Sequence, residues 1–535
     1  MTGDMARHKQ IQVQICLSRP FFAVLLLTAG DVLGLIRIRT LMPNRRNFTI
    51  LPKSLFALAL LGNASGSLTQ TQSGRSTHDI STQDKKRLER FERQVDDLRA
   101  RLKIPGLSAV VLKDQKVVWI KGFGFADLEN KIPTTPGTLF HLASITKTFA
   151  STLIMQLVEQ GKLDLDEPMS HYSTDFKDDS VKIKHLLSHT SSGTPGERFQ
   201  YDGNRYDYLT AVIEKKMGKR FGEVVVETFF DPLGMSSSVP YHHIVVDEDK
   251  WTASLGKEHL NRFKKSLETL AQPYAYYGNG EIIHDTYPYP DFIGAAAGLL
   301  STVQDMAQYD IAIDRHAFIK RETQEQAWTP FVSNSGKRLP YGLGWFVMDH
   351  HGTNLIWHTG DWGSGFSAFY LKVPEKNLSL IMLANSEVLV EHQYSIGEVM
   401  VDDAVRNVFA CSFLGAWDLA YGCERDSRAA MSKFIEQRRA SGKVAIHVSP
   451  KVLVSYVGKY QFETLNNRIF TVTCENDKLF VEETGRPRFQ VFAESETKYF
   501  VKTRTWMLVF TKREGQAAEL SIVEGKYTFP SKRIK

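Results

Sequence analysis

Ser144 and Lys147 form the pair of side chains in this sequence that is best suited to nucleophilic catalysis. They lie three residues apart, and on a helix this spacing brings both side chains to one face. A lysine kept uncharged beside a serine can accept the hydroxyl proton and so activate the serine as a nucleophile. The same Ser-x-x-Lys spacing recurs at residues 254–257 and 495–498, so the surrounding elements must decide among the three pairs.

The segment around Ser144 predicts a helix that begins near the serine. Phe149, Leu153 and Leu157 recur every four residues, as on a buried helix face, and Gly161 stands where a glycine commonly ends a helix. Ser144 therefore lies in the first turn, where backbone N–H groups lack partners within the helix and the helix dipole favours negative charge. Its N–H can help to stabilise an oxyanion. The other two pairs open no comparable helix.

Two further motifs could complete such a site. Tyr201, within residues 195–209, carries a phenol that could pass a proton to a leaving group. His358, Thr359 and Gly360 directly precede a predicted strand, and there the backbone N–H of Asp361 would be a second oxyanion donor. Rival matches to these two motifs, which their surroundings favour less, occur at residues 277–279 and 350–352.

Composition and charge describe an ordinary globular protein without a nucleic-acid partner. The 535 residues leave room for two or three domains, and 42% of them are hydrophobic. The net charge of +6 comes entirely from residues 1–63, which hold eight Lys/Arg and two Asp/Glu. The remainder holds 58 residues of each sign and shows no basic stripe, which argues against nucleic-acid binding.

Residues 1–68 are interpreted as an export signal or a membrane anchor. Apolar runs cover residues 21–36 and 55–61, and paired arginines precede Asn47 and Phe48 in a pattern that resembles a twin-arginine signal. The first run is short for a bilayer span of about 20 residues. Both interpretations place the catalytic part outside the cytoplasm. Residues 69–85 are polar and are expected to form a flexible linker.

The order of predicted elements indicates an α+β domain over residues 86–425, in which an antiparallel sheet is flanked by helices. A helix is expected over 83–103, strand hairpins over 106–123 and 366–385, and a further helical pattern over 396–408. Strands early and late with helices between them favour one sheet closed by both ends of the domain. Residues 426–450 are expected to be a linker. Eight short strand patterns over 451–535 predict a small all-β barrel.

The cysteines give no metal-binding pattern. Cys411, Cys423 and Cys474 follow the leader without the spacing of a zinc site, and no H-E-x-x-H motif is present. A Cys411–Cys423 disulfide and three free or buried thiols are both compatible with the sequence. The predicted chemistry requires neither a metal nor a cofactor.

From about Leu98 to Val388 the chain resembles the class C β-lactamase-like serine hydrolases, relatives of D-alanyl-D-alanine carboxypeptidases and of a branch of esterases. The phrases that carry the resemblance occur in family order along the domain. The region after residue 450 resembles the lipocalin-like domain of some members. The matching phrases are GFGFADLENKIPTTPGTLFHLASITKTFAS, VKIKHLLSHTSSG, PGERFQYDGNRYDYL, AAAGLLSTVQDMAQY and WHTGDWGSGF.

The resemblance implies that Ser144 is acylated and that Lys147 and Tyr201 form its base system. His358, Thr359 and Gly360 would line the opposite edge of the site, while His189 would be structural. The expected function is hydrolysis of esters or small D-amino-acid peptides or amides through an acyl-enzyme.

The sequence departs from the family's Tyr-Ser/Ala-Asn motif, because Gly203 stands in place of the asparagine that holds the lysine and the substrate amide. A neutral His358 in place of a lysine would also bind carboxylate-bearing substrates weakly. Efficient β-lactamase activity is therefore not expected. The altered motif leaves one alternative, a non-catalytic or weakly active penicillin-binding-like protein that holds a cell-wall or lipid fragment.

Overall fold

The computed structural model describes most of the chain and divides it into two compact units, Met1–Ser76 and Thr77–Lys535. In the first unit, β1 (Ile11–Cys16) pairs with β2 (Phe22–Leu27) in an antiparallel hairpin. Most of the predicted leader lies outside the described residues. Within the described part, no helix combines the length and apolar character needed to cross a bilayer. The described residues are 11–16, 22–27, 80–246, 248–277, 281–285, 293–362, 365–392, 403–440, 443–462, 468–484, 488–502, 507–513, 516–524 and 527–534.

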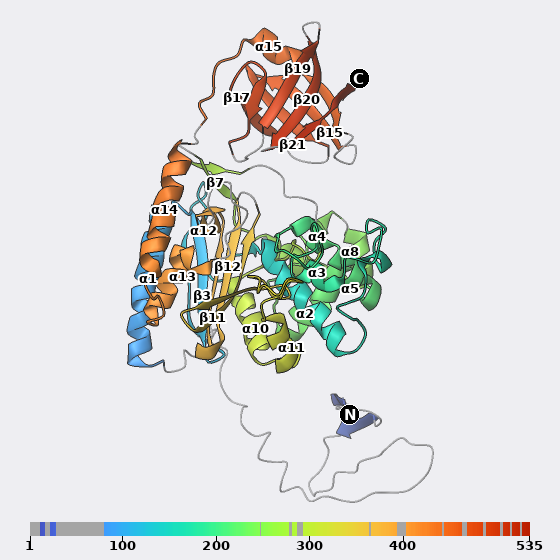
Figure 1. Ribbon diagram of the computed structural model, residues 1–535, viewed down its shortest axis with the longest axis vertical. Coiled ribbons are helices and arrows are strands. Elements are labelled where there is room, and N and C mark those ends of the chain that lie inside the picture. Colours follow the sequence, from blue (N-terminus) through green and yellow to red (C-terminus); the bar gives the residue numbers. More distant parts are fainter. Residues whose placement is uncertain are drawn as a thin grey trace, which may run out of the picture. The chain divides into compact units, whose positions relative to one another are not determined.

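A seven-stranded antiparallel sheet forms the centre of the hydrolase domain (Figure 1). The hairpin predicted over residues 106–123 joins the strands predicted over residues 366–385, since Val111 pairs with Leu380. The two predicted hairpins are therefore confirmed, and the sheet is closed by both ends of the domain, as expected. In spatial order the strands are β10 (Phe346–His350), β11 (Thr353–Asp361), β12 (Ser367–Val373), β13 (Leu378–Ala384), β3 (Gly106–Lys113), β4 (Lys116–Asp127) and β5 (Ile132–Pro133).

Helices cover both faces of this sheet, and side chains alternate between the two resulting cores. Val111 and Leu380 face one core, whereas Val110 and Ile381 face the other. The first core lies under α1 (Thr82–Arg101), α13 (Val408–Ala416) and α14 (Cys423–Ala440), and Figure 1 shows α1 and α14 side by side. The second contains α2 (Thr146–Glu159) and α10 (Val303–Asp314).

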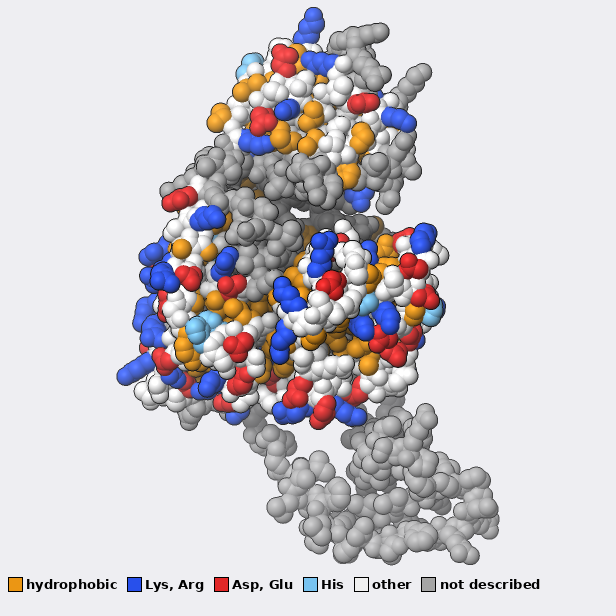
Figure 2. Space-filling view, viewed as in Figure 1, with side chains coloured by type: hydrophobic (Ala, Val, Ile, Leu, Met, Phe, Trp, Pro, Cys, Tyr) orange, Lys and Arg blue, Asp and Glu red, His pale blue; other side chains and the backbone are white. Residues whose placement is uncertain are grey.

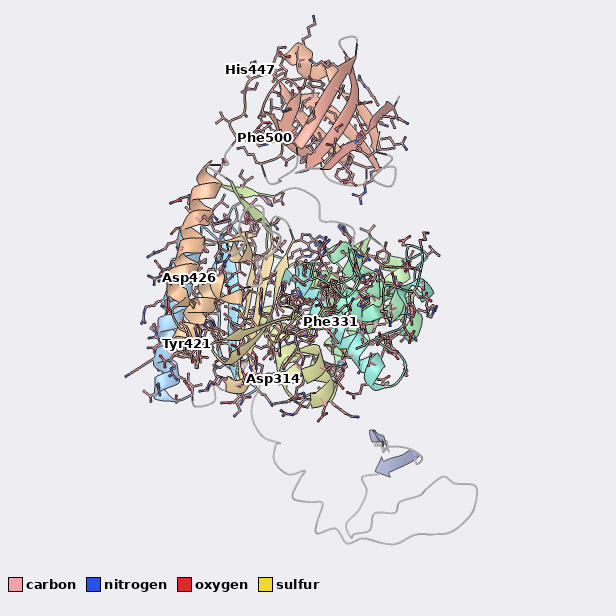
Figure 3. The ribbon with its side chains drawn as sticks, viewed as in Figure 1. Asp314, Phe331, Tyr421, Asp426, His447 and Phe500 are labelled. Atoms are coloured by element: carbon pink, nitrogen blue, oxygen red, sulfur yellow. A yellow bond between two sulfur atoms is a disulfide. The ribbon has the colours of Figure 1, made fainter. Side chains whose placement is uncertain are left out.

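A buried ion pair fastens α10 to β12. The Lys372 ammonium contacts Asp310 and, at 2.8 Å, Asp314 at the end of α10 (Figure 3), while the Tyr370 hydroxyl donates to Asp310 at 2.6 Å. Burial alone would lower the pKa of Lys372, but the two carboxylates raise it above its ordinary value. Lys372 is therefore held in its charged form.

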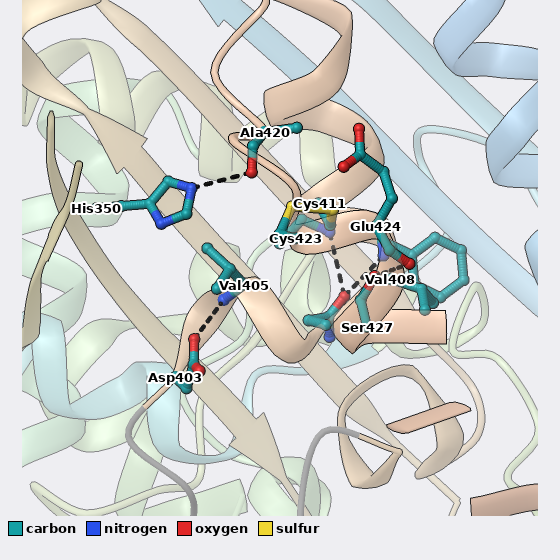
Figure 4. Close-up of a disulfide and its surroundings, with 12 residues drawn as sticks. His350, Asp403, Val405, Val408, Cys411, Ala420, Cys423, Glu424 and Ser427 are labelled. Atoms are coloured by element: carbon teal, nitrogen blue, oxygen red, sulfur yellow. Dashed lines mark hydrogen bonds between the residues drawn. A yellow bond between two sulfur atoms is a disulfide. The ribbon is translucent and has the colours of Figure 1, made fainter. Parts of the chain in front are cut away.

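The segment expected to link the two domains is partly a packed helix. Helix α14 occupies residues 423–440, and its Met431 and Phe434 are buried in the same core as Phe91 of α1. Cys411 and Cys423 form a disulfide that joins α13 to the first residue of α14 (Figure 4), which decides between the two alternatives left open by the sequence. Cys474 is a free thiol.

The C-terminal region contains the eight predicted strands and one more, in a nine-stranded antiparallel sheet. The last strand pairs with the first, and Ser531 donates its N–H to Leu520, so the sheet curls into a nearly closed barrel. Tyr456, Tyr460 and Phe510 fill its interior. The strands are β14 (Gly458–Phe462), β15 (Arg468–Glu475), β16 (Lys478–Glu483), β17 (Phe489–Ala493), β18 (Lys498–Phe500), β19 (Met507–Arg513), β20 (Gln516–Glu524), β21 (Tyr527–Pro530) and β22 (Lys532–Ile534).

Candidate active site

The structure brings the side chains of Ser144 and Lys147 into direct contact. The chain leaves β6 (Phe140–His141), passes through the short 3-10 turn η2 (Ala143–Ile145) and enters α2 at Thr146. Ser144 therefore lies at the start of the helix, as predicted. The Lys147 Nζ lies 2.9 Å from the Ser144 Oγ. Ala143 adopts a left-handed conformation with φ 47°, a strain of about 1–3 kcal/mol that the surrounding structure must hold in place.

Lys147 is almost completely buried. Its second hydrogen bond, at 2.8 Å, goes to the carbonyl oxygen of Ala296. Burial lowers the pKa of Lys147 to about 7, although Asp207 and Asp202 act in the opposite direction. The ammonium form is further contacted by the ring of Tyr201, whose centroid lies 5.1 Å from Nζ. A large fraction of Lys147 is therefore neutral near pH 7 and can accept a proton.

His189 holds Tyr201 beside this pair. The backbone N–H groups on both sides of Tyr201 bond to His189: that of Gln200 to its carbonyl oxygen at 2.8 Å and that of Asp202 to its Nδ1 at 3.2 Å. The two rings are 4.2 Å apart. Burial holds the pKa of His189 well below its ordinary value, so its imidazole is neutral. This geometry fits the structural role expected for His189.

The hydroxyl of Tyr201 belongs to a phenol that stays protonated. Burial raises its pKa above the ordinary range, the neighbouring Ser144 hydroxyl lowers it by less, and the charge of Asp361 raises it further. Immediately after Tyr201, Asp202 caps α4 (Gly203–Asp207) by accepting from the Arg205 N–H at 3.1 Å. The cap fixes the direction in which the chain leaves Tyr201.

His358 is neutral, as expected, but it does not present its ring to the edge of the site. The side chain is 0% exposed. The Tyr341 hydroxyl bonds to Nε2 at 2.8 Å and Nδ1 bonds to the carbonyl oxygen of Thr359 at 2.6 Å. Burial lowers the pKa of His358 to about 3, with a further contribution from Lys147. Direct contact between His358 and a substrate is therefore not supported, and Thr359 is likewise buried.

Gly360 allows β11 to touch the backbone that leads into Ser144. A Cβ atom at this position would lie 2.1 Å from the carbonyl oxygen of Leu142, so a side chain cannot be accommodated without movement. Asp361, the last residue of β11, follows directly and pairs with Ser367 of β12. The glycine thus lets the end of β11 lie beside the Ser144 turn.

The rival motifs lack comparable surroundings. Ser254 and Lys257 are exposed at the junction of α8 (Glu248–Leu255) and α9 (Lys257–Leu267). Residues 495–498 form a turn that leads into the first residue of β18, and residues 350–352 run from the last residue of β10 through the turn to β11. The motif at residues 277–279 lies largely outside the described residues.

Sequence reasoning missed two of the groups that contact the site. Ala296 and Tyr341 bond to Lys147 and His358 from distant parts of the chain. Ala296 lies within a phrase that resembles the family, but an alanine offers only its backbone and gives no chemical signal. Among the described residues, the donor cluster that is compact enough for a metal consists of Cys411, Cys423 and Glu424, and both cysteines are in the disulfide.

The sheet with its two helical layers and the contact between Ser144 and the buried Lys147 define a β-lactamase-related serine hydrolase. The chain belongs to the Beta-lactamase family, whose model matches residues 91–399. It is 24% identical over 445 residues to Penicillin-binding protein 4* of Bacillus subtilis, covering 76% of this chain and 90% of that protein. It is 25% identical over 367 residues to Protein flp of Staphylococcus aureus, covering 60% of this chain and 73% of that protein.

A solved structure supports the same fold. The octameric penicillin-binding protein homologue from Pyrococcus abyssi superposes with a TM-score of 0.51 and 23% identity, covering 83% of this chain and 99% of that one. The expected family and the α+β fold with a C-terminal barrel are thus confirmed.

Proposed function

We propose that the chain hydrolyses esters or small D-amino-acid peptides or amides through an acyl-enzyme on Ser144. The observation that carries this proposal is the 2.9 Å contact between the Ser144 Oγ and the buried Lys147 Nζ. A serine hydroxyl is a weak nucleophile until a base removes its proton, and a neutral lysine at this distance can do so.

Lys147 is the better candidate for the base, because burial keeps Tyr201 in its phenol form. Neutral Lys147 accepts the Ser144 proton on its lone pair while it donates an N–H to the carbonyl of Ala296. The serine oxygen then attacks the substrate carbonyl, and the oxyanion is stabilised by the N–H groups of Ser144 and Asp361. Tyr201 protonates the leaving group and recovers a proton from Lys147. Water hydrolyses the acyl-enzyme by the reverse sequence of proton transfers.

The charges around the site favour neutral substrates over substrates that carry a carboxylate. The described charged groups that act on Lys147 and Tyr201 are the carboxylates of Asp202, Asp207 and Asp361. A substrate carboxylate would meet these charges without an accessible cation at His358, whose ring is buried and neutral. Short esters are therefore the preferred substrate class within this proposal, ahead of penicillins and peptides with a free C-terminus.

Gly203 weakens amide recognition for a second reason. Its Cα lies beside the lysine, since a Cβ there would be 3.9 Å from Lys147 Nζ. The side chain that would hold a substrate amide is missing from this position. An ester needs less assistance, because its leaving group is a better one than an amine.

We further propose that the protein is exported, with its N-terminal segment acting as a signal or an anchor. The support is the order of basic, apolar and small residues over positions 42–66. The partner of the catalytic domain is then a small-molecule or short-peptide substrate outside the cytoplasm.

A substrate panel and a covalent probe test the proposal together. The purified protein is assayed with short p-nitrophenyl esters, D-amino-acid p-nitroanilides and a chromogenic cephalosporin, and it is labelled with a fluorophosphonate. Labelling and ester hydrolysis should disappear in Ser144→Ala and persist in the matched variant Ser254→Ala, whose serine belongs to an exposed Ser-x-x-Lys pair. Faster turnover of the cephalosporin than of the esters would overturn the substrate preference. A native protein that neither hydrolyses nor reacts would favour the non-catalytic binding protein.

A further inference from the structure

We propose that Asp207 is a positioning residue for Lys147, holding the carbonyl group to which the lysine bonds and placing a negative charge behind it. The inference rests on the proposed function and extends it to a residue outside the predicted nucleophile, base and oxyanion groups.

A short chain of hydrogen bonds connects Asp207 to Lys147. The lysine donates to the carbonyl oxygen of Ala296 at 2.8 Å, and the N–H of the same Ala296 donates to the Asp207 Oδ1 at 3.3 Å. The Thr210 hydroxyl also donates to Oδ1, at 2.9 Å, and accepts the N–H of Ala295 at 2.8 Å. Asp207 and Thr210 therefore hold the two consecutive N–H groups that precede the carbonyl to which the lysine donates.

The turn that carries Ala296 is built to lie against this carboxylate. Gly294 closes the turn by donating its N–H to the Ala297 carbonyl at 3.0 Å. A Cβ atom at Gly294 would lie 2.1 Å from the Asp207 Oδ1 and 2.7 Å from the Thr210 Oγ1. The backbone thus approaches the carboxylate more closely than any residue with a side chain would permit.

The charge of Asp207 acts on the lysine in a defined direction. Burial favours neutral Lys147, whereas the carboxylates of Asp207 and, less strongly, Asp202 favour its protonated form. A more basic lysine takes the serine proton more readily, but it is available only above its pKa. The titratable groups acting on or contacting Lys147 are Asp202, Asp207, Tyr201, Tyr206, His189 and His358.

The test compares Asp207→Asn with Asp202→Asn by the pH dependence of the fluorophosphonate labelling rate constant. Each asparagine keeps an oxygen that can accept the existing N–H bonds while it removes the charge, and asparagine also caps helices well. A loss of folded protein that is the same at every pH lowers the rate without moving the pH of the acid limb, so a destabilised variant is still informative. The kcat/KM for ester hydrolysis is measured in parallel.

In Asp207→Asn, loss of the charge should lower the pKa of Lys147. The rise of the labelling rate constant and of kcat/KM with pH should therefore occur at a pH lower by about half a unit or more. The shift should be smaller in Asp202→Asn. An unmoved limb in Asp207→Asn, or an equal or larger shift in Asp202→Asn, would overturn the role of Asp207 while leaving the proposed function intact. A loss of rate at every pH without a shift would mean that Asp207 only supports the fold. A wild-type protein without labelling or hydrolysis would instead defeat the proposed function, and this inference with it.

Discussion

Replacing Gly360 with alanine should lower both activity and stability, because the new Cβ atom would clash with the backbone that precedes Ser144. The new Cβ would lie 2.1 Å from the carbonyl oxygen of Leu142 and 3.1 Å from its carbonyl carbon. Cβ atoms are essentially never closer than 3.0 Å to such neighbours, so β11 and the Leu142 backbone must separate by about 0.9 Å. Ala368, on the other side, would be only 3.2 Å from the new atom and leaves little room for sliding.

Both atoms of Leu142 belong to the main chain two residues before Ser144, so the nucleophile must move with them. A displacement of about 1 Å in a catalytic group reduces the rate by about 100-fold, and overpacking of a buried contact destabilises a protein by about 1–3 kcal/mol. Gly360→Ala should therefore show both effects. Ester kcat/KM and fluorophosphonate labelling report the first, and the urea dependence of unfolding reports the second.

Gly203→Ala is the matched control, because this glycine also lies beside the catalytic pair but has room for a methyl group. Its Cβ would be 3.9 Å from Lys147 Nζ, which is an ordinary contact. The position is the first of a helix, where alanine is well tolerated. We expect its stability to stay within about 0.5 kcal/mol of the wild type. A Gly360→Ala protein that unfolds like the wild type and keeps its activity within twofold would refute this account of the close approach.

Further predictions concern the lysine, the altered motif, the turn and the disulfide. Because catalysis needs neutral Lys147 and its pKa is lowered to about 7, ester kcat/KM should rise with pH through this value, with about a tenth of the maximum at pH 6; a profile flat down to pH 5 would exclude Lys147 as the base. Gly203→Asn should increase cephalosporin acylation relative to ester hydrolysis, by restoring an amide beside the lysine; an unchanged ratio would show that Gly203 does not set the preference. Gly294→Ala should lower kcat/KM by displacing the Ala296 carbonyl, whereas unchanged kinetics would show that the close approach at Gly294 does not position this carbonyl. Replacing Cys411 and Cys423 by serine should reduce the free energy of unfolding by about 3 kcal/mol in a urea titration, and no reduction would mean that packing alone holds α14.

Local patterns were sufficient for the elements whose stabilising contacts lie close together in sequence. Phe149, Leu153 and Leu157 predicted a helix, and the structure buries all three on α2. The hairpins over 106–123 and 366–385 formed as expected because each strand pairs with its neighbour across a short turn. The spacing of Ser144 and Lys147 is likewise local, and the contact between them follows directly from helix geometry.

Residues 426–450 combine charged positions with a few apolar ones, and helix α14 covers residues 423–440. Residues 426–450 hold seven charged residues among 25, and they were expected to link the domains. Met431 and Phe434 are three residues apart and are buried in the core that also contains α13, and the Cys411–Cys423 bond joins the start of α14 to α13. A sequence pattern with so few apolar positions cannot distinguish an outer helix of the domain from a linker.

His358 shows why the electrostatics of the site required the fold. Its neutrality was predicted from the ordinary pKa of imidazole, but in the structure burial lowers the pKa of His358, with a further contribution from Lys147. The burial of the ring matters for substrate binding. An exposed neutral histidine could still bond to a substrate carboxylate, whereas this buried one cannot. Any preference for neutral substrates must then come from Asp202, Asp207 and Asp361, whose carboxylates were not singled out from the sequence. Asp207 becomes part of the site only because it meets Ala296, 89 positions further along the chain, beside Lys147.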